Sequence, residues 1–268
     1  MRAEMTQVAA TVAAILGANP PAAANPRPIR PVVDTLAGAP RLAVVAIDAL
    51  GEWTLARHVD RAPTLAALGR LRRGTLRSVL PAITPVNFAT MATGAGPFAH
   101  GVRVRTDPLP LDTVFDRLRT VGKTGATASR DLSSVGKLLA PRADWGLISA
   151  ANLDSEVLTL ATSVISQHRP DFILVHFLDV DDGSHAGGPS SETAGEALAA
   201  TDGRLRSLLP ALAEREYALI VLADHGQHDA EPADNDPHHR GTHSGRVEAD
   251  VLVPLFWATP AEVAWLAG

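Results

Sequence analysis

The sequence predicts an α/β protein with a doubly wound, mostly parallel sheet and helices on both of its faces. Apolar runs of strand length alternate along the chain with segments of helical periodicity. The strand candidates are unbroken apolar runs, as in 41–47 (RLAVVAI) and 171–177 (DFILVHF), which is typical of strands buried on both faces. Because 268 residues, 46% of them hydrophobic, are enough for one large core, we expect 1–268 to form a single domain.

Residues 1–40 are expected to form a helix followed by a linker rich in proline and alanine. A signal peptide is the alternative, since an apolar run precedes small residues that could form a cleavage site. We favour the helix, and with it a cytoplasmic location, because the run is weak and interrupted by threonine. No stretch approaches the roughly 20 apolar residues of a membrane span. The residues that predict this helix by their spacing are Met5, Val8, Val12, Ile15 and Leu16.

The remaining elements are predicted from short apolar runs and from helix start signals. Pro63 suits the first turn of a helix, and Asn152 is expected to cap one. Pro254 predicts an edge position for the last strand, because proline cannot donate a ladder hydrogen bond. Strands are predicted over 41–47, 75–80, 124–128, 145–149, 171–177, 218–223 and 250–258. Helices are predicted over 63–71, 86–93, 111–121, 152–168 and 191–213.

The composition limits the kinds of site that this chain can build. It contains no cysteine, which excludes disulfides, thiolate metal sites and a cysteine nucleophile. The formal net charge is -5, so the sequence predicts no basic surface for nucleic acid. A metal site would use aspartate, glutamate, histidine and other oxygen ligands, and ten histidines are enough for one. The sequence makes no prediction about the oligomeric state.

Acidic residues and histidines follow three of the predicted strands directly. Asp48 ends one strand, Asp224 and His225 end another, and a third leads into Asp181 and His185. Parallel strands place their carboxyl ends at one rim of the sheet, so we expect these side chains to meet there. Buried carboxylates repel each other unless cations compensate them, and no lysine or arginine adjoins these acids in the sequence. The pattern therefore predicts a metal site, with zinc favoured and manganese the second choice.

Two further segments are suited to the same site. Thr84 follows a strand and precedes a helix, where backbone N–H groups and the positive helix end favour an anion. His243 lies in a glycine-flanked loop, from which its side chain can reach inward. Taken alone, Asp48 is as readily an Asx turn as a ligand. Neighbouring alternatives are Asp179 and Asp182 for Asp181, Thr90 and Thr93 for Thr84, and His238 and His239 for His243.

These segments come in the order of the motifs of the alkaline phosphatase superfamily. Each motif alone arises often by chance, whereas five in the right order are specific. Over roughly residues 40–246 the chain most resembles the nucleotide pyrophosphatase/phosphodiesterase branch. The likeness rests on Asp48 after a strand, Thr84 in PAITP, Asp181 and His185 before GGP, the DHG of 224–226, and His243 in GTHSG.

The resemblance implies an alkaline phosphatase-like fold and two divalent metal ions. It implies a hydrolase in which Thr84 attacks phosphorus and a covalent phosphothreonine forms. The substrate would be a small-molecule phosphate mono- or diester, or a nucleotide-type compound. The implied ligand sets are Asp48, Thr84, Asp224 and His225 for one ion, and Asp181, His185 and His243 for the other.

One segment departs from this resemblance. The diesterase branch carries a segment like HGIxxN, whose Asn binds a phosphate oxygen, whereas this chain reads HGVRVRTD. Arg105 stands at the Asn position and Arg103 lies nearby. A guanidinium binds two oxygens at once, which favours a dianionic monoester over a diester. A solvated surface face is the alternative for both arginines.

Three other functions compete with the hydrolase. A metal-dependent phosphomutase would need a second domain to enclose its substrate, and this chain leaves little room for one. A sulfatase is less favoured, because its nucleophile is made from cysteine or serine and Thr84 is neither. A metal-binding relative without turnover is the non-enzyme alternative, and the presence of Thr84 argues against it.

Overall fold

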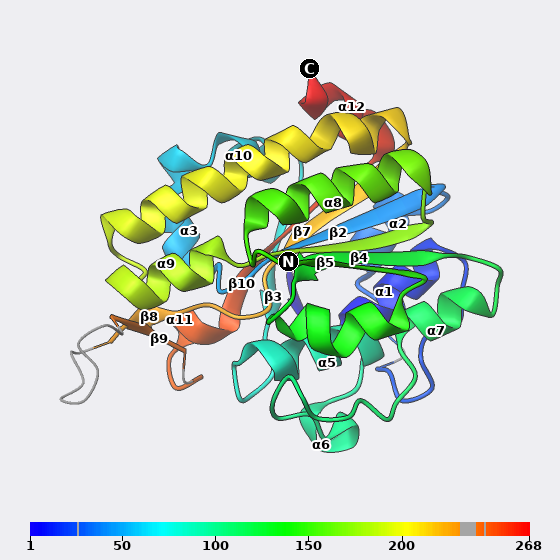
Figure 1. Ribbon diagram of the computed structural model, residues 1–268, viewed down its shortest axis with the longest axis horizontal. Helices are drawn as coiled ribbons and strands as arrows, with labels where there is room; N and C mark the ends of the chain where they lie inside the picture. Colours follow the sequence, from blue (N-terminus) through cyan, green and yellow to red (C-terminus); the bar gives the residue numbers. More distant parts are fainter. Residues whose placement is uncertain (26, 231–239, 244) are drawn as a thin grey trace.

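The structure is a computed structural model that describes residues 1–25, 27–230, 240–243 and 245–268. Its main sheet has eight strands in the order β1-β3-β10-β7-β2-β6-β4-β5 (Figure 1). Neighbouring strands are parallel except at β10, which is antiparallel to β3 and β7. The predicted mostly parallel sheet is confirmed. The strands are β1 (Arg2–Glu4), β2 (Arg41–Ile47), β3 (Arg73–Arg77), β4 (Gly125–Arg130), β5 (Trp145–Ser149), β6 (Phe172–Phe177), β7 (Tyr217–Leu222) and β10 (Leu252–Ala258).

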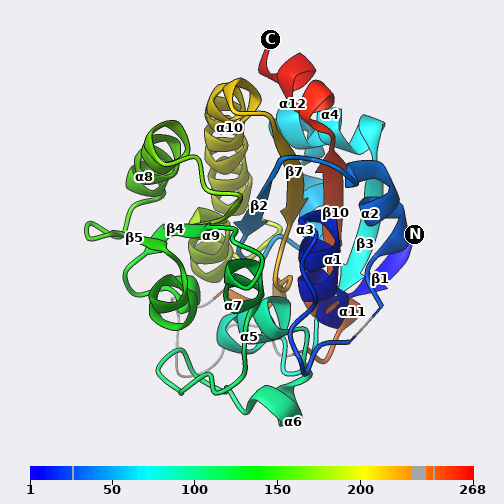
Figure 2. The same ribbon diagram turned by 90° about the vertical axis from the view of Figure 1, so that its right-hand side faces the viewer.

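Helices cover both faces of this sheet, as predicted. Figure 2 shows α8, α10 and α12 on one side of the strands and α1, α5 and α7 on the other. Smaller elements are the pair β8 (His228–Asp229) and β9 (Gly241–Thr242), three 3-10 turns at Met5–Gln7, Val59–Arg61 and Ala140–Arg142, and a π-helical turn at Val135–Leu139. The α-helices are α1 (Val8–Ile15), α2 (Arg30–Leu36), α3 (Glu52–Arg57), α4 (Pro63–Leu71), α5 (Thr84–Thr93), α6 (Pro97–His100), α7 (Val114–Arg119), α8 (Asp154–Gln167), α9 (Asp179–Gly187), α10 (Glu192–Glu214), α11 (Glu248–Val251) and α12 (Pro260–Ala267).

The centre of the sheet explains why its strands are unbroken apolar runs. All residues of β6 and β7 are buried, and so are all residues of β2 except Arg41. Helices pack on both faces of these strands, so neither face can carry polar side chains without a partner. The polar residues are therefore displaced to the strand ends, where the candidate site lies.

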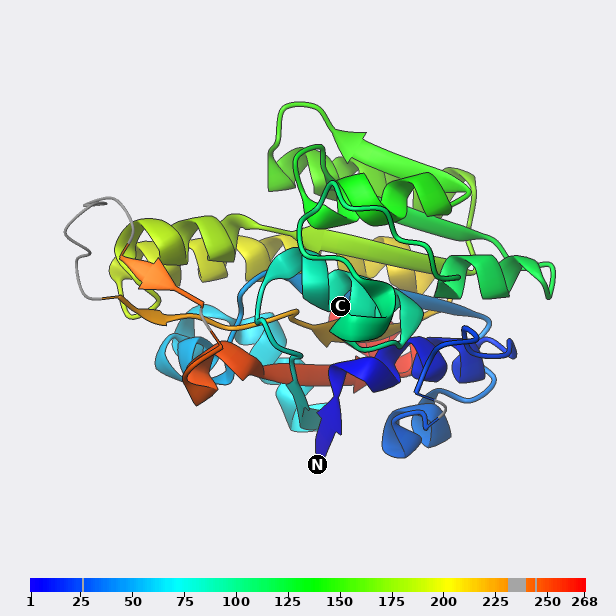
Figure 3. The same cartoon turned by 90° about the horizontal axis from the view of Figure 1, so that it is seen from below.

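The N-terminal segment packs on the domain as expected, and it adds a strand that the sequence did not predict. The helix α1 is buried along seven of its eight residues. Figure 3 shows β1 and α1 in dark blue, against the rest of the fold. The strand β1 pairs with β3 over only three residues, which is too short for a recognisable pattern. The proline-rich segment is tied back to α1, because Thr11 Oγ1 accepts a hydrogen bond of 2.9 Å from Ile29 N. None of the described helices combines the length and the apolar character that a membrane crossing requires.

Two local predictions are wrong, for identifiable reasons. Asn152 does not cap α8: its backbone is left-handed, with φ 55°, and Leu153 occupies the cap position. Asn152 Oδ1 instead accepts a hydrogen bond of 3.2 Å from Leu132 N. Pro254 does not mark an edge strand, because β10 lies between β3 and β7. The ladder with β7 begins only at Leu255, so no β7 residue is paired with the proline.

Candidate metal centre

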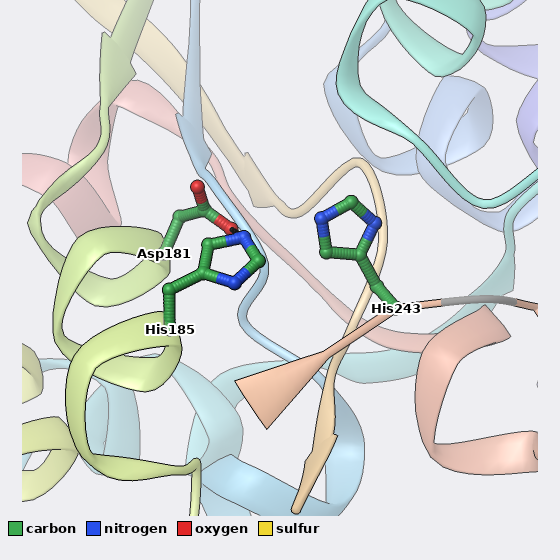
Figure 4. A group of neighbouring side chains, drawn as sticks. All are labelled: Asp181, His185 and His243. Carbon is green, nitrogen blue, oxygen red and sulfur yellow. Dashed lines mark ion pairs between the residues drawn. The ribbon is translucent and has the colours of Figure 1, made fainter. Parts of the chain in front are cut away.

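Six of the predicted ligands form two groups of three at the carboxyl end of the central strands. Within each group, one ligand atom per residue lies within 4.8 Å of the others. We call Asp48, Asp224 and His225 the buried triad, because each is at most 1% exposed. We call Asp181, His185 and His243 the rim triad, because all three side chains are partly exposed. Figure 4 shows Asp181 and His185 on one helix, with His243 reaching toward them from another segment.

The buried triad comes from the ends of two adjacent parallel strands. Asp48 directly follows β2, and Asp224 and His225 follow β7, which pairs with β2. His225 Nε2 lies 3.5 Å from Asp48 Oδ1 and 3.4 Å from Asp224 Oδ2. Glycine is required after His225, since a Cβ on Gly226 would lie 2.0 Å from the carbonyl oxygen of Ala249. The DHG sequence thus holds two ligands at a point where another backbone segment passes closely.

The electrostatics of the buried triad favour a cation. Asp48 Oδ1 and Asp224 Oδ2 are buried, and neither has a hydrogen-bond partner. Burial raises the pKa of Asp48 well above its ordinary value, and the charge of Asp224 raises it further. The pKa of Asp224 is also raised, again mainly by burial. Two unpartnered carboxylate oxygens beside an imidazole nitrogen are the donor set of a divalent metal ion, so these residues fit the ion that the sequence predicts.

The rim triad combines one helix with one loop. Asp181 and His185 are four residues apart on α9, with Asp181 Oδ1 3.4 Å from His185 Nε2. His185 Nδ1 lies 3.0 Å from the Gly241 carbonyl oxygen, and His243 Nδ1 lies 2.8 Å from that of Ala82. Each Nδ1–H can donate to its carbonyl oxygen, and in that tautomer the lone pair of the ring that a metal ligand needs is on Nε2. Burial lowers the pKa of His243 to about 4, so its imidazole is neutral near pH 7 and able to bind a metal.

Thr84 and the two stacked imidazoles join the triads into one site. Thr84 is the first residue of α5, after Ile83 in extended conformation, and Pro85 stabilises the first turn. Thr84 Oγ1 lies 3.2 Å from His225 Nε2. The rings of His225 and His243 are stacked, with centroids 4.1 Å apart. All seven predicted ligands are therefore brought together, and Thr84 lies beside the buried triad.

The competing residues are engaged elsewhere or lie outside the described residues. Asp179 and Asp182 both bind Arg130, the latter through Arg130 Nη1 at 2.6 Å. Thr90 Oγ1 lies 3.0 Å from His100 Nε2, and Thr93 Oγ1 donates to the carbonyl oxygen of its own helix at Ala89. His238 and His239 belong to the segment that the structure does not describe.

A cleft of about 800 Å³ opens onto Thr84. Asp48 and Asp181 line it, and so do Arg103 and Arg105, which the sequence predicts as substrate-binding residues. The turn that carries both arginines is held by Asp107 Oδ2, which accepts hydrogen bonds from the backbone N–H groups of residues 103 and 104. The structure thus places a positively charged turn at the same cleft as the predicted nucleophile.

Sequence reasoning missed the side chains that hold the ligands in place. His176 Nε2 lies 2.9 Å from Asp48 Oδ2, and Gln227 Nε2 donates a hydrogen bond of 2.6 Å to Asp181 Oδ1. Asp250 accepts a hydrogen bond of 2.8 Å from Gly245 N and lies 2.6 Å from His228 Nδ1. These two contacts connect the segment that carries His228 with the loop that carries His243. An imidazole inside the apolar run FILVHF was the available signal for His176. No sequence pattern distinguishes Gln227 or Asp250.

Compensating cations are present, although none adjoins the acids in sequence. Arg130, at the end of β4, is buried and binds Asp154 Oδ1 at 2.7 Å, besides Asp179 and Asp182. Arg204 Nη2 binds Asp179 Oδ2 at 2.6 Å. The fold brings these two arginines to the first turn of α9 from distant parts of the chain, so adjacency in the sequence does not reveal them. None of these ion pairs includes a member of the buried triad.

The fold and this donor set define a member of the alkaline phosphatase superfamily. The chain belongs to the type I phosphodiesterase / nucleotide pyrophosphatase family, whose model matches residues 42–107 and 128–247. No curated protein sequence matches the chain.

Several solved structures share the fold. Phosphonoacetate hydrolase from Sinorhizobium meliloti 1021, in complex with phosphonoacetate, is 22% identical with a TM-score of 0.55, over 73% of this chain and 59% of that one. Murine ectonucleotide pyrophosphatase / phosphodiesterase 5 is 16% identical with a TM-score of 0.57, over 71% and 58%. The C-terminal periplasmic domain of Escherichia coli EptC, in complex with Zn, is 16% identical with a TM-score of 0.59, over 85% and 75%. The match therefore spans only about 60% of the first two relatives.

Proposed function

We propose that this protein is a metal-dependent hydrolase of small phosphoric esters in which Thr84 is the nucleophile. The observation that carries the proposal is the position of Thr84 Oγ1, at the start of α5 and 3.2 Å from His225 Nε2 of the buried triad. A hydroxyl at this point faces the cleft and has backbone N–H groups of a helix start nearby. Murine ectonucleotide pyrophosphatase / phosphodiesterase 5 in complex with AMP is an inactive variant with one threonine replaced by alanine, which supports a threonine nucleophile in this family.

Two divalent ions are part of the proposal. The buried triad with the Thr84 oxygen would hold one, and the rim triad would hold the other. Mixed carboxylate and imidazole donors suit zinc, with manganese as the second choice, and the EptC domain in complex with Zn supports zinc. When bound, such ions lower the pKa of a coordinated hydroxyl and stabilise negative charge on the attacking and leaving oxygens.

The residues of the chain supply the covalent step. Thr84 Oγ1 loses its proton and attacks phosphorus in line with the ester oxygen, whose bond to phosphorus breaks. The leaving oxygen takes up a proton and departs as an alcohol, and phosphothreonine remains. Water then attacks the same phosphorus, and the bond between phosphorus and Thr84 Oγ1 breaks. One proton of the water returns to Thr84 Oγ1, and a monoester substrate yields inorganic phosphate.

Arg103 and Arg105 bind the non-bridging oxygens of the substrate in this proposal. Both line the cleft with Thr84. A guanidinium forms two parallel hydrogen bonds with a phosphate group that carries two charges, which favours monoesters over diesters.

Replacing Thr84 by alanine tests the proposal. We expect hydrolysis of an aryl phosphate to fall by about four orders of magnitude or more, because the attacking oxygen is removed. Zinc measured by elemental analysis should remain bound, since the other six ligands are unchanged. Thr162→Ala, on α8 and away from the cleft, is the matched control and should retain activity. Near-normal turnover in Thr84→Ala would contradict the nucleophile assignment.

A further inference from the structure

His100 is a buried imidazole that belongs to neither triad and does not line the cleft. It begins the segment HGVRVRTD, in which the chain departs from the motif of its family. The residue is 1% exposed and ends the short helix α6, which lies beside α5 (Figure 1). Because a buried imidazole needs hydrogen-bond partners for its ring nitrogens, those partners show which parts of the fold it connects.

The directions of the two hydrogen bonds of His100 follow from their partners. Val102 N donates to His100 Nδ1 at 3.1 Å, so the lone pair of the ring is on Nδ1. The proton of the neutral ring is then on Nε2, which lies 3.0 Å from Thr90 Oγ1 and donates to it. Burial lowers the pKa of His100, so the ring is neutral near pH 7. Gly101, with φ 71°, lets the chain turn back so that Val102 N reaches the ring.

The two partners of His100 belong to the two parts of the chain that the proposed reaction needs. Thr90 lies on α5, the helix that begins at Thr84, and its side chain is fully buried. Val102 directly precedes Arg103 in the sequence, and its side chain is also buried. One imidazole therefore joins the helix of the proposed nucleophile to the turn that carries the two arginines of the cleft.

The arginine turn, which we define as residues 103–107, has few other attachments to the domain. Among the described residues, all of its hydrogen bonds stay inside the turn: Asp107 Oδ2 accepts from the N–H groups of residues 103 and 104, and Asp107 N donates to the Val104 carbonyl oxygen at 3.0 Å. The chain is held again after the turn, where the Leu109 carbonyl oxygen accepts from Arg142 Nη2. Before the turn, the hydrogen bond from Val102 N to His100 is the corresponding attachment.

We propose that His100 is a positioning residue, which holds the arginine turn against α5 so that Arg103 and Arg105 face the phosphate group bound beside Thr84. The inference rests on the proposed function, because only that proposal assigns the arginines to the substrate. A guanidinium binds two phosphate oxygens only in a defined orientation, and both arginines are exposed and carried by a short turn. Fixing the backbone of that turn relative to Thr84 reduces the conformational freedom that substrate binding must remove.

A double-mutant cycle on phosphate binding tests the proposal. The probe is inorganic phosphate, and calorimetry on zinc-loaded protein measures its dissociation constant. We expect His100→Ala to weaken phosphate binding about tenfold. The combination of Arg103→Gln and Arg105→Gln should weaken it by about tenfold or more, because both guanidinium groups are lost. Adding His100→Ala to that double variant should change the dissociation constant by less than about twofold, since the imidazole acts through the arginines.

Conservative variants show which contact of the ring is responsible. In His100→Asn, an amide oxygen can still accept the hydrogen bond from Val102 N, so phosphate should bind within about threefold of the wild-type affinity. Thr90→Val removes the acceptor of Nε2–H at nearly constant side-chain volume and should weaken phosphate binding about threefold. Thr93→Val is the matched control, because Thr93 is equally buried on α5 but bonds Ala89, and it should leave phosphate binding unchanged. If His100→Ala does not fold, Thr90→Val takes its place in the cycle.

The outcomes separate this inference from the proposed function. Equal weakening by His100→Ala with and without the arginines, or no weakening at all, would overturn the inference and leave the hydrolase proposal in place. Unchanged phosphate binding in the arginine double variant would overturn the inference together with the substrate-binding role of Arg103 and Arg105. If the expected coupling is found but zinc- or manganese-loaded wild-type protein hydrolyses no aryl phosphate, the hydrolase proposal fails and the positioning role of His100 stands.

Discussion

The buried triad and the rim triad contain the same kinds of donor but differ in how the fold holds them. Asp48 and His225 are 1% and 0% exposed as side chains, whereas Asp181 and His185 are 16% and 27% exposed. The buried residues follow directly from β2 and β7, the paired central strands of the sheet. The rim residues come from α9 and from the loop after β9, which pairs with β8 over two residues. One half of the site is therefore fixed by the core, and the other half by shorter, more exposed elements.

This difference predicts an unequal dependence on metal. Burial makes the ionised carboxylates of Asp48 and Asp224 costly without a cation, and the raised pKa of each reports that cost. At the rim, Asp181 accepts a hydrogen bond from Gln227, and solvent reaches the side chains. An ion in the buried triad should therefore contribute more to the free energy of unfolding than an ion at the rim.

The largest effect is expected for Asp224→Asn. This change removes one of two buried, facing carboxylates, while an amide oxygen can still accept the bond from Ala49 N. In metal-free protein we expect the free energy of unfolding to stay equal or rise, because an unpaired buried charge is lost. The increase in the free energy of unfolding on adding zinc should be about 2–3 kcal/mol smaller than in the wild type, as expected for the loss of one tightly bound ion. Urea unfolding with and without zinc measures both values.

Asp181→Asn is the matched control, since it makes the same change in the rim triad. It should alter the metal-free stability by less than about 0.5 kcal/mol, because the side chain is partly exposed and an amide oxygen can still accept the bond from Gln227. It should also reduce the zinc-induced increase in stability by a smaller amount than Asp224→Asn does. A metal-free Asp224→Asn protein that is clearly less stable than the wild type would contradict the unequal roles of the two triads.

A smaller effect is expected from the side chains that hold the ligands. Gln227→Leu removes the donor to Asp181, and His176→Phe removes the partner of Asp48. Each should weaken zinc binding about 10–100-fold at its own triad, because such partners orient the ligand and tune its basicity. Competition titrations with a chelating dye, which resolve two binding steps, measure the two affinities. The prediction is wrong if either variant weakens both steps equally.

The smallest effect is expected in the rates at which the two zinc ions dissociate from the protein. On adding a chelator to zinc-loaded wild-type protein, we expect two phases, with the faster one several-fold ahead of the slower. The faster phase should come from the rim triad, because its ligands are partly exposed. His185→Ala should abolish that phase and leave the slower one. Stopped-flow absorbance of a zinc-binding dye follows both phases, and loss of the slower phase in this variant would reverse the assignment.

The same contrast explains how much of the site could be predicted from the sequence. Asp48, Asp224 and His225 stand out because each ends a long apolar strand, and strand ends of a parallel sheet meet at one rim. The helix α9 was not predicted, since its residues include three aspartates and two glycines and show no apolar periodicity. Without that helix, the choice of Asp181 over Asp179 and Asp182 rested on spacing alone.

Contacts between distant segments were beyond reach of the sequence. Gln227 lies 46 residues from Asp181, and Arg130 lies 24 to 52 residues from the carboxylates that it binds. The position of β10 inside the sheet was mispredicted for the same reason. Pro254 would interrupt a hydrogen-bond ladder with β7 only if β7 extended alongside it, and the sequence does not show where that neighbouring strand ends.

The sequence by itself determined the layered α/β fold, because burial on both faces forces apolar runs, and it placed the candidate donors Asp48, Asp224 and His225 at the ends of those runs. The other candidate donors came from the resemblance of their motifs to a known superfamily. Only the tertiary structure showed that the buried triad is enclosed by the core and that the rim triad is partly exposed. It also decided which side chains hold them and which line the cleft. Those properties depend on packing between segments far apart in the chain, which periodicity and local propensity do not record.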